Sequence, residues 1–139
     1  MTLEEAQWFV NDHALSVKVK VFGRKQRSRI CAEYFPLLRA IYVCPELFMK
    51  DPDQNWKRAT LLHEIGHAST NDYSNMITSE FVAHKWALLR ARECKLKDVE
   101  DSLIEVAKNW VTDTKIYKSK CYNTAAKKIL CWYNNNLLI

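Results

Sequence analysis

The stretch His63-Glu64-Ile65-Gly66-His67 matches the pattern H-E-x-x-H and decides how the rest of the chain is interpreted. On an α-helix the two histidines stand at positions i and i+4, so their imidazoles lie on one face and can reach a single metal ion. The glutamate between them then lies beside that face, where it can take a proton from a metal-bound water. The motif therefore predicts zinc ligands at His63 and His67 and a catalytic general base at Glu64. A helix that carries two histidines by chance is the alternative.

The residues before the motif predict the helix that this chemistry needs. Asp51 is placed to cap its N-terminus, Pro52 to occupy the first helical position and Gln54 to complete the capping pattern. Apolar residues then recur at helical spacing from Trp56 through the motif. The polar run 69–75 is expected to end the helix.

The chain before this helix predicts an N-terminal helix and a short sheet of about three strands. Thr2 and Glu5 form a capping box that opens the first helix. Alternating and β-branched apolar residues, closed by glycine and proline, predict strands at 17–22, 29–34 and 39–44. The segment from Ile41 to Cys44 is expected at the edge of the sheet, where it could hold a substrate as an added strand.

Helical patterns continue after the motif, with expected starts at Asn75 or Thr78 (to Glu93), at a cap on Asp98 and at a cap on Asn123. Together the elements predict an α+β fold: a small zincin-like domain with an N-terminal helix, a short sheet, the H-E-x-x-H helix, a glutamate helix and C-terminal helices. We expect one metallopeptidase-like domain over 1–139, with a catalytic core at 1–95. The C-terminal helical part, 96–139, is expected to pack on that core, with a helix-turn-helix DNA reader as the alternative.

A catalytic zinc ion takes three protein ligands and keeps one position open for water, so a third ligand is required. Glu80 is the best candidate, because it follows His67 after enough residues for the chain to turn and start an antiparallel helix. Its apolar neighbours imply that a charge must compensate the carboxylate, and a divalent metal supplies one. An ordinary glutamate in the first turn of a helix is the alternative. Asp72, His84 and, more distantly, His13 are the other candidate ligands.

His84 and Tyr73 are candidates for roles around the metal. His84 stands four residues after Glu80 on the same helical face, so it could bind the metal, hold Glu80 in place or bind a developing oxyanion. A histidine without a role in the site is an equal alternative. Tyr73 is a candidate for oxyanion stabilisation. Thr70 and Tyr73 stand where the longer metzincin motif has glycine and histidine, which leaves a glutamate-type site.

The bulk composition favours a soluble protein of one domain, with 48% hydrophobic and 27% charged residues. The polar start and the lack of an apolar run of about 18 residues predict a cytoplasmic protein with no membrane segment. Five scattered cysteines without a C-x-x-C pair argue against disulfides and against a cysteine-rich zinc site. The net charge of +5 suggests acidic partners. Because the basic residues are scattered along the chain, direct nucleic-acid binding is not expected.

Two segments resemble the ImmA/IrrE family of small zinc metallopeptidases. Members carry a leader such as R-F-T-L-A-H-E-L-G-H, to which R-A-T-L-L-H-E-I-G-H at 58–67 is similar. They follow it with a helix of the form E-x-E-A-x-x-F-A, and E-F-V-A-H-K-W-A-L-L at 80–89 looks like it, with Val82 in place of the second glutamate. The resemblance covers residues 8 to 92.

The resemblance implies a zinc-dependent endopeptidase in which His63, His67 and Glu80 bind Zn2+ and Glu64 is the base. Members are often encoded by phages or other mobile elements and cleave a repressor or regulatory protein. The implied partner is therefore an intracellular protein or peptide substrate, such as a DNA-binding repressor. Two alternatives are a non-catalytic zincin-fold module that regulates or binds DNA or protein, and a SprT-like protease, which acts on DNA-bound proteins and typically uses a third histidine.

Overall fold

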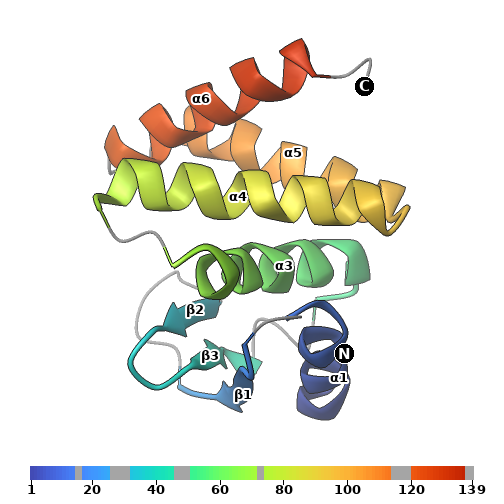
Figure 1. The fold of residues 1–139 in the computed structure, drawn as a ribbon. Helices are drawn as coiled ribbons and strands as arrows, with labels where there is room; N and C mark the ends of the chain where they lie inside the picture. The colour runs from blue at the N-terminus through green and yellow to red at the C-terminus, as the bar shows by residue number, and fades with distance from the viewer. Residues whose placement is uncertain (15–16, 26–31, 46–50, 72–73, 114–119, 137–139) are drawn as a thin grey trace.

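The computed structural model describes residues 1–14, 17–25, 32–45, 51–71, 74–113 and 120–136, and within them the fold is α+β. Its elements are α1 (Leu3–His13), β1 (Lys20–Gly23), β2 (Ala32–Phe35), β3 (Ala40–Val43), α3 (Gln54–Thr70), α4 (Met76–Glu93), α5 (Lys97–Thr112) and α6 (Lys120–Asn135). Figure 1 shows the sheet and α1 at one end, α3 and α4 in the middle, and α5 and α6 at the other end. None of the described helices combines the length and the apolar character that crossing a membrane requires.

The sheet is mixed, and its central strand is β3. This strand pairs with β1 in parallel and with β2 in antiparallel orientation, so the order is β1-β3-β2. The prediction that Ile41–Cys44 forms the edge is therefore wrong. Ile41 and Val43 are completely buried, and a strand this apolar takes the centre, where both of its neighbours shield it. Strand β2 lies at the edge instead.

Local capping chemistry defines the helix that carries the motif. The side chain of Asp53 accepts a hydrogen bond from the Trp56 N–H at 2.9 Å and is the N-cap of α3. The prediction of Asp51 as the cap is wrong by two residues; its carboxylate accepts the Asp53 N–H at 2.8 Å instead. The helix ends at Thr70, and Asn71 follows in the left-handed conformation, so the predicted end in the polar run is confirmed.

The capping box of α1 is confirmed, because Thr2 and Glu5 satisfy each other's backbone N–H groups. The start of α4 is also confirmed: Asn75 caps it by accepting the Thr78 N–H at 2.9 Å. Each cap depends on residues only three positions apart, so the sequence alone can predict it.

The two predicted caps in the C-terminal half are wrong. Helix α5 follows Leu96, which makes no side-chain cap, and Asp98 lies in its first turn, where the helix dipole favours an acidic residue. Helix α6 already includes Lys120, so Asn123 lies inside it, and its amide donates to the Val111 carbonyl oxygen at 3.4 Å.

Helices α3 and α4 lie unusually close because of Gly66. A Cβ atom at this position would lie 2.3 Å from the backbone oxygen of Ala83 on α4, which no real side chain tolerates. Leu62 and Ile65 on α3 are completely buried in the core around this contact. The glycine within the motif thus sets the distance between the two helices that carry the candidate ligands.

Candidate metal centre

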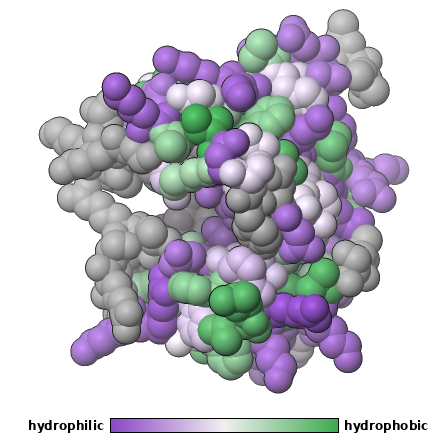
Figure 2. Space-filling model, turned by 60° about the vertical axis from the view of Figure 1, so that its left-hand side comes forward, coloured by the Kyte–Doolittle hydropathy of each residue, from purple (hydrophilic) through white to green (hydrophobic). Residues whose placement is uncertain are grey.

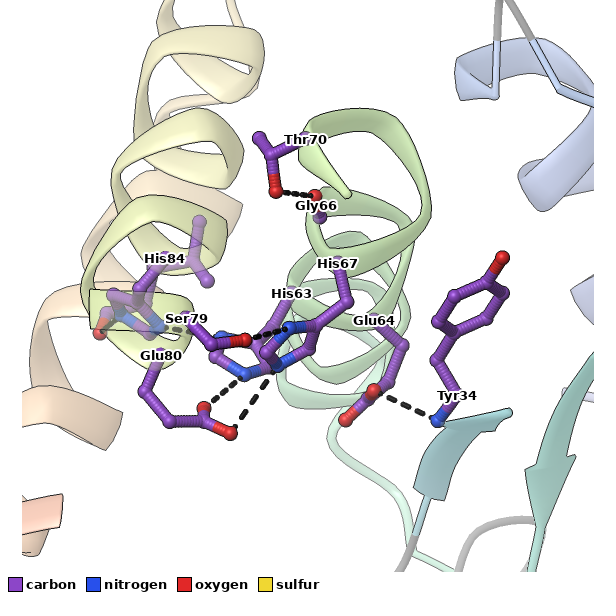
Figure 3. Close-up of polar contacts among 10 residues, drawn as sticks. Tyr34, His63, Glu64, Gly66, His67, Thr70, Ser79, Glu80 and His84 are labelled. Atoms are coloured by element: carbon purple, nitrogen blue, oxygen red, sulfur yellow. Dashed lines mark hydrogen bonds and ion pairs between the residues drawn. The ribbon is translucent and has the colours of Figure 1, made fainter. Parts of the chain in front are cut away.

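Three side chains from α3 and α4 converge on one point, as Figure 3 shows. His63 Nε2 lies 2.8 Å from Glu80 Oε2, and His67 Nε2 lies 3.3 Å from Glu80 Oε1. One ligand atom from each of His63, His67 and Glu80 lies within 4.8 Å of the other two. The structure thus brings together the three residues that the sequence nominates as ligands.

This geometry fits a zinc ion. In a tetrahedral site with bonds of about 2.0–2.1 Å, neighbouring ligand atoms stand about 3.3 Å apart, as His67 Nε2 and Glu80 Oε1 do, whereas His63 Nε2 and Glu80 Oε2 would have to separate by about 0.5 Å from their 2.8 Å contact. Two imidazoles and one carboxylate also form one of the donor sets of catalytic zinc, which leaves a fourth position open. The side chains are only 11% (His63) and 12% (His67 and Glu80) exposed, so the site is sheltered yet reachable. The residues present therefore fit the metal that the motif implies.

Helix α4 also holds the other ring nitrogen of each histidine. Ser79 Oγ lies 3.2 Å from His67 Nδ1, and His84 Nδ1 lies 2.9 Å from His63 Nδ1 (Figure 3). A hydrogen bond at Nδ1 fixes the orientation of a metal-binding imidazole and its tautomer. Both rings are therefore held so that Nε2 faces Glu80.

The hydrogen bond that His84 makes on its far side determines where the protons of the His63–His84 pair lie. His84 Nε2 lies 2.8 Å from the backbone oxygen of Leu103, and a carbonyl only accepts, so Nε2 carries the proton. Burial and the nearby His63 ring lower the pKa of His84 to about 3, so its ring is neutral and Nδ1 is an acceptor. His63 must then donate from Nδ1, which orients Nε2 towards the metal position; without an ion, Nε2 lies 2.8 Å from Glu80 Oε2 instead.

The C-terminal helices take part in this arrangement. Leu103, whose oxygen accepts the His84 proton, belongs to α5, and so does Trp110. The Trp110 ring packs edge-on against His63 at 5.5 Å and at a tilt against His84 at 5.1 Å. The ring restricts the motion of both imidazoles, so α5 forms the back wall of the site.

Glu64 lies on the other side of the cluster, between α3 and the sheet. Its Oε2 accepts a hydrogen bond from the backbone N–H of Tyr34 on β2 at 3.0 Å (Figure 3). Burial raises the pKa of Glu64, although the His63 and His67 rings and the Tyr34 N–H act in the opposite direction. A partly buried carboxylate with a raised pKa beside a metal position is suited to taking and returning a proton.

The electrostatics of the three candidate ligands are coupled. Burial alone would raise the pKa of Glu80, but its contacts with His63 and His67 together lower it well below the usual range. Burial alone would lower the pKa of His67, but Glu80 and Glu64 raise it. The Glu80 carboxylate is thus ionised although it is largely shielded from water, and it favours positive charge beside it.

The remaining candidates lie elsewhere. His84 is completely buried behind His63 and hydrogen-bonds it rather than Glu80. His13 accepts a hydrogen bond from Arg90 Nε at 3.1 Å, at the far ends of α1 and α4. Asp72 and Tyr73 fall outside the described residues.

The sequence did not reveal Ser79, Trp110 or the backbone oxygen of Leu103 as parts of the site. Ser79 has a weak signal, since it directly precedes Glu80 on the helix. The other two have none, because they come from α5, far along the chain.

Comparisons with known proteins identify no relatives: no family model, no curated protein and no solved structure matches the chain.

Proposed function

We propose that this protein is a zinc-dependent endopeptidase with a zincin-like fold. His63, His67 and Glu80 would hold the ion, and Glu64 would act as general base. The observation that carries the proposal is the convergence of the Nε2 atoms of both histidines on the Glu80 carboxylate, with Glu64 beside them. When bound, zinc supplies a water with a pKa lowered to about 7 and polarises a carbonyl oxygen.

The role of Glu64 follows from its surroundings. The Tyr34 N–H fixes one of its carboxylate oxygens and leaves the other for a proton in transit. Glu64 accepts the proton of the attacking water and then donates it to the nitrogen of the leaving amine, so it ends the cycle ionised. Its raised pKa brings proton uptake and release closer in free energy at neutral pH.

Strand β2 supplies the place for the substrate. Among the described strands it is the sheet edge that contacts Glu64, and its other side pairs with β3. An extended peptide that adds to this edge would run past the general base. The role that we assigned from sequence to Ile41–Cys44 therefore passes to β2.

A cytoplasmic repressor or regulatory protein of a phage or mobile element is the substrate that we propose, on the resemblance of 58–67 and 80–89 to the ImmA/IrrE family. A SprT-like site with a third histidine has less support. The only histidine available on α4 is His84, which bonds His63 and not the metal position.

The test is the variant Glu64→Gln, incubated with a library of cellular peptides whose new N-termini are read by mass spectrometry. We expect the zinc-loaded wild type to cut the library and the variant to lose at least about 100-fold in rate, since it has no base. The zinc content should stay the same. Glu105→Gln, an exposed position on α5, is the matched control and should cut normally. A fully active Glu64→Gln protein would contradict the proposal, and so would a zinc-loaded wild type that cuts nothing.

A further inference from the structure

The face of the sheet that points away from α3 carries three aromatic rings side by side. The rings of Phe22 and Tyr42 stack at 5.5 Å, and Phe35 meets Tyr42 edge-on at 5.2 Å. Strand alternation puts them opposite the buried Ile41 and Val43. Phe22 is 44% exposed and the other two rings are partly exposed. Exposed aromatic rings gathered on a sheet face that none of the described helices covers mark a candidate interaction surface.

Positive charge gathers in the segment of the sequence that contains these strands. Residues 17–43 contain seven Lys or Arg and one Glu, a net charge of +6, whereas the rest of the chain contains 14 Lys or Arg and 15 Asp or Glu, a net charge of −1. The segment 17–43 thus accounts for all of the excess positive charge of the protein. Figure 2 shows a patch of hydrophobic surface at the sheet end of the molecule, with hydrophilic residues around it, and further hydrophobic patches over the helical half.

The cations lie next to the rings. Lys20 shares the face of Phe22 by strand alternation, and Lys18 lies two residues before it, with the buried Val19 between them; both lysines are exposed. The Arg24 guanidinium lies over Phe35 at 5.3 Å and over Tyr42 at 5.8 Å. Arg24 also pairs with Glu33 at 2.7 Å, and Glu33 is the one acidic residue of the segment 17–43. The lysines therefore give this face a positive charge that Glu33 does not cancel.

We propose that this outer sheet face, made by Phe22, Phe35, Tyr42, Lys20 and Arg24, binds single-stranded nucleic acid. Flat rings on a sheet stack on unpaired bases, and neighbouring lysines contact the phosphates. A duplex hides the faces of its bases, so it cannot use the rings. An acidic peptide needs the charges but not an exposed aromatic side chain such as Phe22. The combination therefore favours an unpaired strand over both.

The face is separate from the metal centre and goes beyond the proposed peptidase. Glu64 contacts the backbone of β2 from the side of α3, whereas the rings lie on the opposite side of the same sheet. Nucleic-acid binding can therefore be measured without zinc and in the inactive Glu64→Gln protein. Failure of one proposal leaves the other intact.

The test is fluorescence anisotropy of a labelled oligothymidylate of about 12 nucleotides, within the range that one such face covers. We expect the full-length protein to bind it at least about tenfold more tightly than a duplex of the same length. Contacts with about three or four phosphates predict a slope of about −2 to −3 in a plot of log affinity against log salt.

Two variants test the charge and the ring, and circular dichroism confirms their folding. Lys20→Glu should weaken binding at least about fivefold, whereas Lys127→Glu, an equal charge change on α6 at the other end of the molecule, should change it less than about twofold. Phe22→Leu keeps an apolar side chain at an exposed site but removes the ring, and it should also cost at least about fivefold.

Four results would overturn the proposal. The first is no binding of the oligothymidylate at low salt. The second is equal weakening by the Lys20 and Lys127 variants, which would mean attraction by overall charge. The third is full binding by Phe22→Leu or equal binding of the duplex, since stacking would then be absent. The fourth is equal competition by polyglutamate of the same charge, which would identify an acidic protein as the ligand.

Discussion

Two buried carboxylates on neighbouring helices, Glu80 on α4 and Glu100 on α5, are held in different ways. Glu100 is 6% exposed and accepts hydrogen bonds from Arg92 Nη2 at 2.9 Å and from the Tyr133 hydroxyl at 2.7 Å. The Glu80 side chain is 12% exposed, and its partners among the described residues are two histidines. Glu100 thus has a cation that never loses its charge, whereas Glu80 does not.

This difference indicates that Glu100 has a structural role, whereas Glu80 needs a bound ligand to compensate its charge. A buried carboxylate is stable when a fixed positive charge and hydrogen bonds compensate it, as at Glu100. Among the described residues Glu80 has only imidazole partners, whose charge depends on pH, so it lacks the permanent positive charge that Arg92 gives to Glu100. A divalent cation supplies that charge, and the same rings are aligned to bind it. The following predictions test this contrast.

The largest effect is expected from replacing each carboxylate by its amide. Glu80→Gln should weaken zinc binding by at least about 100-fold, because the ligands share a binding free energy on the order of 10 kcal/mol. The metal-free protein should unfold at nearly the same temperature as the wild type. Glu100→Gln should bind zinc normally but lose about 1–3 kcal/mol of stability, since Arg92 and Tyr133 lose their acceptor. Zinc titration and thermal unfolding measure both; the reverse pattern would remove the distinction.

Gly66 controls whether the two helices can share a metal at all. Gly66→Ala puts a Cβ atom against the backbone of α4, and we expect a loss of about 3 kcal/mol in stability together with weaker zinc binding. Gly23→Ala is the matched control, because its Cβ atom would meet only side-chain atoms, with Pro45 at 3.0 Å and Leu3 at 3.3 Å. Equal melting temperatures for the two variants would show that close packing of α3 on α4 is not needed.

The helices and the motif were predictable because their signals are local. The i and i+4 spacing of the histidines and the side chains of Thr2 and Asn75 need only a few neighbouring residues. The start of α3 was missed by two residues, because Asp51 and Asp53 offer the same capping chemistry. The central position of β3 was missed because strand order depends on partners far along the chain.

The site was predictable only in part for the same reason. His63, Glu64 and His67 lie in one motif, whereas Glu80 was only the preferred one of several candidates for the third ligand. The position of His84 behind His63, rather than at the metal, depends on how α4 packs on α3 at Gly66. The Leu103 oxygen is a backbone atom, and because every residue has one, the sequence does not predict its role.

His84 lies between the candidate ligand His63 on α3 and the Leu103 oxygen on α5, and its substitution should have an intermediate effect. His84→Leu fills a similar volume but cannot accept the Nδ1 proton of His63, so zinc affinity should fall by about 10–100-fold. His84→Asn places an amide oxygen near the position of the ring Nδ1 and should restore most of that affinity. Zinc competition titrations compare the two. Equal affinities would mean that His84 only fills space.

The smallest effect is expected at His13, which belongs to a structural network. Burial, followed by the charge of Arg90, lowers the pKa of His13, so the folded protein keeps its ring neutral. The unfolded chain takes up the proton below about pH 6.5, and stability must therefore fall as the pH drops through that value. His13→Gln should weaken this pH dependence and leave zinc binding unchanged. Urea unfolding at pH 7.5 and 5.5 measures it, and an unaltered difference would contradict the assignment.

The most direct test of the central claim is a crystal structure of the zinc-loaded protein, with the ion located by anomalous scattering at the zinc edge. We predict one ion per chain, at about 2.0–2.2 Å from His63 Nε2, His67 Nε2 and a Glu80 oxygen, and His84 still bonded to His63 Nδ1. An ion bound elsewhere, a cysteine ligand at this site, or an empty cluster at saturating zinc would contradict the account.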